Sequence, residues 1–315
     1  MTKLSDSTDF MNITNKLSNA TIEGDTRNIP LEVSFIVTII INSITCPFTV
    51  LFNVLVIMAV KRRPRLQSNT NTLLACLAVT DALTGLTTQP SFILWKTFQL
   101  LDMTNFHNIM RVLHSSFLRS VSVCSCLHLM LLTCERLIAI NFTKYYPHVV
   151  IKRNIKVAVI AFWIFSIFLE ILSLTNQKAI VSVLVGLVLN SCILFISFSY
   201  VMLYRETRRH RNMIKTQQLP QEEVERFVKE NKALKTTVIV VGTVLLCLLP
   251  AAIASVLNVA APSWRATLFF VFTPWIRTCG MLNSLFNPLI YCWRQQEMRK
   301  FVFRFPAAQV VHPAQ

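Results

Sequence analysis

Residues 33–60 read VSFIVTIIINSITCPFTVLFNVLVIMAV, and none of these side chains carries a charge. A helix needs roughly 20 such residues to cross the hydrocarbon core of a bilayer, which is about 30 Å thick. Six further apolar runs are long enough for a crossing. They lie at residues 69–95, 106–140, 154–176, 179–204, 233–259 and 265–292. The sequence therefore predicts an all-α membrane protein, a bundle of seven transmembrane helices.

The composition also separates this chain from soluble proteins. Hydrophobic residues make up 53% of its 315 residues and charged residues 15%, against roughly 45–50% and 25% in soluble domains. Lysine and arginine exceed aspartate and glutamate by 31 − 15 = 16, which in a soluble chain would suggest a nucleic-acid partner. Most of these basic residues lie in short connectors between apolar runs, where they orient the protein in the membrane. We therefore expect no nucleic-acid partner.

The basic residues are shared unequally between the two sides of the predicted bundle. Connectors after the first, third, fifth and seventh runs are rich in them, whereas the opposite connectors hold few, such as Lys96 and Lys178. Basic connectors stay in the cytosol, which places the N-terminus outside the plasma membrane. Asn12 and Asn19 begin sequons on that outer side and are expected to be glycosylated, whereas the sequon at Asn141 lies in the cytosol.

The chain divides into four segments. After the seventh run, Phe301 and Val302 alternate with Arg299 and Lys300 at helical spacing, which is typical of an amphipathic helix at the membrane interface. We expect an extracellular glycosylated tail, a seven-helix membrane domain, this interfacial helix and a short cytoplasmic tail. They cover residues 1–32, 33–292, 293–305 and 306–315, respectively.

Several polar residues interrupt the predicted spans. An amide or a charge at this depth costs several kcal/mol unless it is paired, so each is a candidate functional residue. A carboxylate surrounded by amides and hydroxyls can hold a small hard cation, so we expect a sodium or proton site centred on Asp81. A purely structural polar cluster is the alternative. The residues concerned are Asn53, Asp81, Ser125, Asn283, Ser284 and Asn287.

A second candidate site lies at the inner end of the third run, at Glu135-Arg136. Arginine has five donors and a permanent charge, so it can exchange one set of acceptors for another. We expect this pair to act as a latch between two arrangements of the helices. Glu230, just before the sixth run, is either a second carboxylate for the latch or a solvated charge in an acidic loop.

Two prolines in the last two runs are candidate hinges. Pro250 and Pro288 each remove a backbone hydrogen bond and permit a kink. Pro288 belongs to the segment Asn287-Pro288-Leu289-Ile290-Tyr291, which joins a kink to a buried amide and a tyrosine.

Together these residues resemble the rhodopsin-like class of G protein-coupled receptors over residues 33–305. The ordered set comprises Asn53, LACLAVTD ending at Asp81, Ser125, Glu135-Arg136-Leu137, Trp163, Tyr200, Lys232 to Pro250, and NPLIY at 287–291. The resemblance implies a receptor, not an enzyme, that converts binding of an extracellular ligand into activation of a heterotrimeric G protein.

The same resemblance implies roles for individual residues. Arg136 would contact the G protein and rest against Glu135 and Glu230, while Tyr200 and Tyr291 would swing inward as the sixth helix moves outward. Asp81, Ser125, Asn283, Ser284 and Asn287 would form an allosteric Na⁺ pocket. No covalent cofactor is implied.

The chain departs from the family pattern at its outer face. Arg111 stands where a cysteine usually forms a disulfide, and the second outer connector, near Asn176, has no cysteine, so no disulfide is expected. Cys192 replaces a common proline, and Leu248 replaces the usual tryptophan switch. The short, bridge-free outer face looks similar to the melanocortin and adenosine-like branch.

The ligand remains open at this stage. Leu118 stands where amine receptors of this class carry an aspartate, which disfavours an amine, and residues 264–292 hold no lysine for retinal. Basic side chains lie toward the outer side, and if they converge they favour an anionic or lipid ligand. Snorkelling to membrane lipids is the alternative. The candidate ligand residues are Arg111, His114, Leu118, Arg119 and Arg277.

Two other functions remain open. An ion-coupled transporter or channel could use the site around Asp81, although no inverted repeat is apparent. A silent or constitutively active receptor is suggested by Leu248 and the missing disulfide.

Overall fold

The computed structural model describes residues 29–142, 145–175, 177–216 and 271–308, with scattered positions between 221 and 257. Over these residues the chain is helical and contains no β-strand, as predicted for an all-α protein. The helices are α2 (Ile29–Arg62), α3 (Asn69–Leu83), α4 (Gln89–Leu100), α5 (Thr104–Asn141), α6 (Tyr146–Val149), α7 (Lys152–Leu174), α8 (Lys178–Thr216), α11 (Thr273–Arg294) and α12 (Gln296–Ala308).

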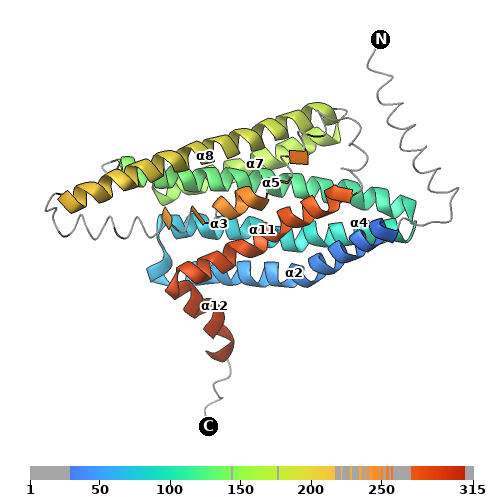
Figure 1. Cartoon of the computed structure of the whole chain (residues 1–315), viewed down its shortest axis with the longest axis horizontal. Helices are drawn as coiled ribbons and strands as arrows, with labels where there is room; N and C mark the ends of the chain where they lie inside the picture. Colours follow the sequence, from blue (N-terminus) through green and yellow to red (C-terminus); the bar gives the residue numbers. More distant parts are fainter. Residues whose placement is uncertain are drawn as a thin grey trace, which may run out of the picture.

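The long helices lie side by side along the long axis of the molecule, and α12 turns away from them at one end (Figure 1). Four stretches within them have the length and hydropathy for a membrane crossing by themselves. These are Pro30–Arg62, Thr104–Asn141, Lys152–Leu174 and Ile180–Arg209. Many large apolar side chains on α7 and α8 remain exposed, Ile164 and Leu194 among them, as expected for helices that face lipid. The structure describes the predicted sixth span, residues 233–259, only in part, with residues 241–247 as its longest continuous stretch.

The second span is not one continuous α-helix. A π-helical turn, η2 (Thr84–Thr88), separates α3 from α4, and α4 has a proline in its first turn. Within η2, Gly85 lies against α2, because its carbonyl accepts a hydrogen bond from Cys46 Sγ at 3.1 Å. A Cβ atom on Gly85 would lie 2.7 Å from Val50 Cγ2. The turn therefore requires glycine where the second span touches the first.

The main hydrophobic core lies in the half of the bundle that carries α12. It joins side chains such as Val56 of α2, Leu77 of α3, Leu129 of α5 and Tyr291 of α11. The apolar face of α12 adds Met298, Phe301 and Val302 to the same core, so this helix is anchored on the bundle.

The start of the amphipathic helix differs from the prediction. It was expected from residue 293, but α11 continues to Arg294 and α12 begins at Gln296. The backbone N–H of Gln295 still donates to the carbonyl of Tyr291 at 2.9 Å, so the helical hydrogen bonding of α11 extends past the apolar run.

Candidate functional site

The predicted latch is a buried ion pair at the end of α5. Glu135 and Arg136 each retain only 2% of their side-chain exposure. Arg136 Nε donates to Glu135 Oε2 at 2.5 Å, and Arg136 Nη2 donates to the other carboxylate oxygen. A buried charge pair is stable only when further hydrogen bonds satisfy its remaining donors and acceptors.

Two other segments supply those hydrogen bonds. Thr70 of α3 accepts from Arg136 Nη2 and lies 3.1 Å from Glu135 Oε1, to which its hydroxyl can donate. Tyr146 of α6 donates its hydroxyl to the same oxygen at 2.8 Å. Burial and the adjacent Glu135 charge raise the pKa of Tyr146 to about 12, so the phenol keeps its proton at neutral pH. We call these four residues the Arg136 cluster.

Sequence reasoning missed Thr70 and Tyr146. Neither belongs to a motif with Glu135, from which they are separated by 65 and 11 positions. The Glu230 side chain, the other predicted partner, lies outside the described residues.

The two tyrosines of the predicted switch belong to the main hydrophobic core of the α12 half. Tyr291 is completely buried and Tyr200 is packed against the core from α8. Among the described residues neither hydroxyl has a hydrogen-bond partner. Each is therefore a polar group that a rearranged bundle can pair.

The predicted cation site is a buried polar centre between α3 and α11. Asn287 Nδ2 donates to Asp81 Oδ2 at 2.8 Å, and both side chains are almost fully buried. Ser284 Oγ donates to Thr84 Oγ1 at 3.2 Å, and Asn53 Nδ2 donates to the Ser284 carbonyl at 2.9 Å. The structure therefore brings together most of the polar residues that the sequence singled out.

The oxygen atoms of this centre suit a small hard cation. The side-chain oxygens of Asn53 and Asn287 in this centre are buried without a hydrogen-bond partner in the described part of the chain, as is that of Asn283 on the same helix as Asn287. Neutral oxygens around one carboxylate are the ligands that hard cations prefer. Ser125 lies half-buried on α5.

At the opposite end of the bundle the predicted ligand residues do not all meet. Arg119 pairs with Glu170 of α7 through Nε–Oε1 at 2.5 Å and Nη2–Oε2 at 3.2 Å. Arg111 is exposed and Leu118 is half-buried. No sequence motif links Glu170 to Arg119, because the two residues lie 51 positions apart.

His114 and Arg277 instead gather around Trp95. The Arg277 guanidinium lies 4.8 Å from the centre of the Trp95 ring, and the His114 ring stacks on Trp95 at 5.6 Å. Lys96 Nζ lies 4.1 Å from the same ring. We call Trp95, Lys96, His114 and Arg277 the Trp95 cluster.

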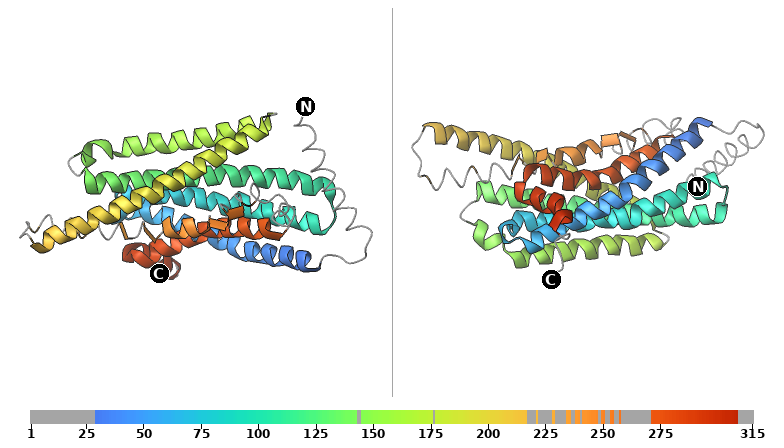
Figure 2. Two further views of the ribbon diagram at one scale, coloured as in Figure 1. Left: turned by 45° about the horizontal axis from the view of Figure 1, so that its top comes forward. Right: turned by 90° about the horizontal axis from the view of Figure 1, so that it is seen from below.

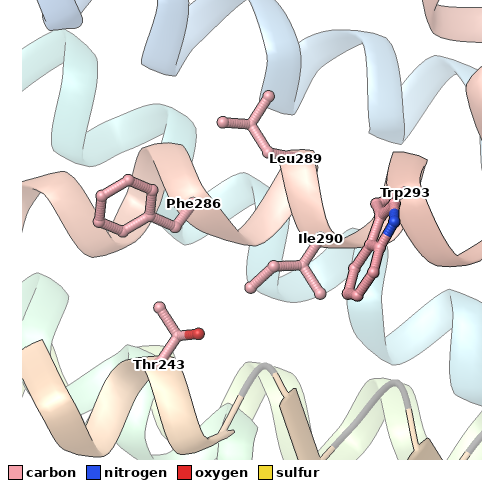
Figure 3. A pocket seen from close by; sticks show the side chains of 5 residues that line it. All are labelled: Thr243, Phe286, Leu289, Ile290 and Trp293. Atoms are coloured by element: carbon pink, nitrogen blue, oxygen red, sulfur yellow. The ribbon is translucent and has the colours of Figure 1, made fainter.

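An open apolar groove of about 430 Å³ lies in the α12 half, between α11 and the sixth span. Thr243 faces Ile290 and Phe286 across it, and Trp293 closes one side (Figure 3). Of the other predicted structural residues, Pro288 is buried in α11. Pro250, in the sixth span, and Trp163, in α7, are half-buried.

The chain matches the family model described as 7 transmembrane receptor (rhodopsin family), over residues 52–182 and 172–291. It therefore belongs to the rhodopsin family of seven-transmembrane receptors, as the sequence motifs indicated, and is a multi-pass membrane protein.

Curated relatives include receptors of several kinds. The alpha-1A adrenergic receptor of Oryzias latipes is 26% identical over 301 residues, covering 80% of this chain and 63% of the relative. The histamine H2 receptor of Cavia porcellus is 25% identical, covering 80% and 74%, and melanocortin receptor 5 of Mus musculus is 24% identical, covering 80% and 78%. This chain thus spans less than two thirds of the length of the adrenergic relatives. The melanocortin-like placement stays a prediction.

Proposed function

We propose that this chain is a plasma-membrane receptor, with its N-terminus outside, that converts binding of an extracellular ligand into nucleotide exchange on a heterotrimeric G protein. The observation that carries the proposal is the Arg136 cluster. A permanently charged guanidinium is held inside the α12 end of the bundle by a carboxylate and hydroxyl groups from three separate segments. The family relatives are receptors, and we expect no covalent chemistry.

The cluster fits a switch because its parts belong to different helices. Closing it ties α5 to α3 and to α6, so any movement of α5 against these segments must break hydrogen bonds to a charged group. Opening it would free the Arg136 donors for carbonyl oxygens of a bound partner. The hydroxyls of Tyr200 and Tyr291, which lack a hydrogen-bond partner among the described residues, would stabilise the rearranged bundle.

We further propose that the sixth helix moves outward, with Pro250 as its hinge and Glu230 as a second resting partner of Arg136. Pro250 lacks the N–H that would fix the helix at that point. The apolar groove between α11 and the sixth span borders the surfaces that would separate.

The polar centre around Asp81 would hold a sodium ion that favours the resting arrangement. Asp81 would supply the charge, and the oxygens of Asn283 and Asn287, which have no hydrogen-bond partner in the part of the chain that the structure describes, would complete the coordination. An amine ligand is not proposed, because the uncharged Leu118 stands at the place where the family resemblance puts the amine-binding carboxylate.

The test is ligand-independent nucleotide exchange on a panel of purified G proteins, with membranes that contain the full chain. Arg136→Ala is compared with Arg111→Ala, which removes an exposed arginine from the opposite end of the same helix. We expect exchange above that of empty membranes, altered by Arg136→Ala and unaffected by Arg111→Ala.

A different result would favour another function. If the surface-expressed protein supports no exchange but conducts a sodium flux that Asp81→Asn abolishes, the chain is an ion transporter or channel. Exchange that is already maximal without ligand would instead identify a constitutively active receptor.

A further inference from the structure

The helices α2 and α11 begin at the same end of the bundle, at the right of Figure 1 and of both views in Figure 2. The Trp95 cluster draws on this part of α11, near its start at Thr273. Its residues come from α4, α5 and α11. Trp95, Lys96 and His114 are 2%, 3% and 0% exposed, respectively. Lys96 and His114 are therefore enclosed with one indole ring, against which the half-buried Arg277 also lies.

No carboxylate among the described residues forms an ion pair with these cations. Glu170, at the same end of the bundle, is engaged by Arg119. The Lys96 ammonium donates instead to the neutral Gln99 Oε1 at 2.8 Å and lies 4.0 Å from the Phe35 ring. Residues 258–270, which precede α11, contain no aspartate or glutamate.

The cluster also contains buried nitrogen atoms without a partner in the described part of the chain. They are Arg277 Nη1, Trp95 Nε1 and His114 Nε2. Arginine and indole nitrogens can only donate, and a buried donor without an acceptor costs about 1–3 kcal/mol. The His114 Nδ1 atom donates to the Thr88 carbonyl at 3.1 Å, so Nε2 of the neutral ring is an acceptor, and the Arg277 and Trp95 nitrogens are the donors open to an oxyanion.

We infer that the Trp95 cluster binds the oxyanion head group of this receptor's ligand, a carboxylate or a phosphate. This inference rests on the proposed receptor function and names the ligand class. The head group would supply both the missing negative charge and the missing acceptors. A guanidinium is suited to this because its planar donors match two oxygens of a carboxylate or phosphate.

Snorkelling to membrane lipids accounts for the exposed position of Arg111, but it does not account for the buried positions of Lys96 and His114. Snorkelling places a charged head in water while its stem covers apolar surface. The Lys96 ammonium instead lies between two aromatic rings of the protein. The Arg277 guanidinium also contacts an aromatic ring of the protein, that of Trp95.

The test is the thermal stability of the purified full chain in phosphatidylcholine nanodiscs, titrated with inorganic phosphate, butyrate or lysophosphatidate. Lysophosphatidylcholine, which has no net charge, is the control. We expect a saturable rise in Tm with at least one anion and none with the control. A response to phosphate or butyrate identifies a free anion, and a response to lysophosphatidate alone identifies a lipid-borne head group.

The site is assigned with two charge-removing variants, Lys96→Gln and Arg277→Gln. Each should move the titration midpoint at least about 10-fold higher, whereas Lys96→Arg, which keeps the charge, should move it less. The control is the double variant Arg119→Gln/Glu170→Gln, which removes an ion pair without changing net charge and should leave the midpoint in place.

The inference would be overturned by no shift with any anion, by an equal shift with lysophosphatidylcholine, or by a shift that survives both Lys96→Gln and Arg277→Gln. A shift that appears only after the N-terminal carboxylates are replaced would also overturn it, because it would show that the chain's own tail is the occupant. These carboxylates are Asp6, Asp9, Glu23 and Asp25. Binding is read without a G protein, so failure of the receptor function would be seen separately in nucleotide exchange.

Discussion

Single hydrogen bonds decide how firmly Arg136 is held. The Tyr146 hydroxyl donates to Glu135 Oε1 at 2.8 Å, and a hydrogen bond to a charged group contributes about 1.5–3 kcal/mol. Tyr146→Phe removes this bond with little change in shape, and we expect basal nucleotide exchange to rise several-fold. Tyr145→Phe, at the neighbouring exposed tyrosine, is the control. Equal exchange from both variants would show that Tyr146 does not restrain Arg136.

Another prediction at the residue scale concerns Asp81. Replacing the carboxylate by an amide removes the only charge that we propose for the sodium site, although its shape is kept. In wild type, sodium chloride should raise Tm more than choline chloride at the same concentration, and Asp81→Asn should abolish the difference. Asp102→Asn is the control, because Asp102 is exposed at φ 53°, a conformation that asparagine tolerates. A sodium effect that persists in Asp81→Asn would exclude this site.

At the scale of elements, the turn η2 determines how closely the second span approaches the first. A methyl group on Gly85 would meet Val50 at 2.7 Å and the Cys46 carbonyl at 3.3 Å. Overpacking of this kind costs about 1–3 kcal/mol, so Gly85→Ala should lower the Tm of the purified protein.

The matched control is Gly280→Ala, in α11. A Cβ atom there would meet nothing within 4 Å among the described residues, and alanine favours the helix by up to about 1 kcal/mol. Its Tm should be unchanged or higher. If both variants melt like wild type, the contact between η2 and α2 is looser than the structure shows.

At the scale of the whole molecule, the orientation in the membrane follows from charge placed outside the helices. With the N-terminus outside, Asn12 and Asn19 should carry glycans and Asn141 should not. Glycosidase treatment should increase the electrophoretic mobility of the wild-type chain, and Asn12→Gln/Asn19→Gln should remove that change. Asn141→Gln should migrate as wild type does; a glycan at Asn141 would reverse the proposed topology.

The sequence by itself determined the class of the fold and the family. Long apolar runs must form helices in lipid, since no water is present to satisfy the backbone. Asp81 and Arg136 are recognisable from the sequence as candidate site residues, because an unpaired charge at that depth in the membrane costs several kcal/mol. The pairing of α3 with α11 through Asp81 and Asn287 joins two residues that the sequence had already placed in one site.

The partners of these residues were decided only by the tertiary structure. Thr70 and Tyr146 complete the Arg136 cluster, Glu170 neutralises Arg119, and Trp95 gathers Lys96 with Arg277. Hydropathy fixes which segments are helices, but the rotation of each helix about its axis determines which side chains meet. That rotation depends on packing between distant segments, including the close approach at Gly85, and no local pattern encodes it.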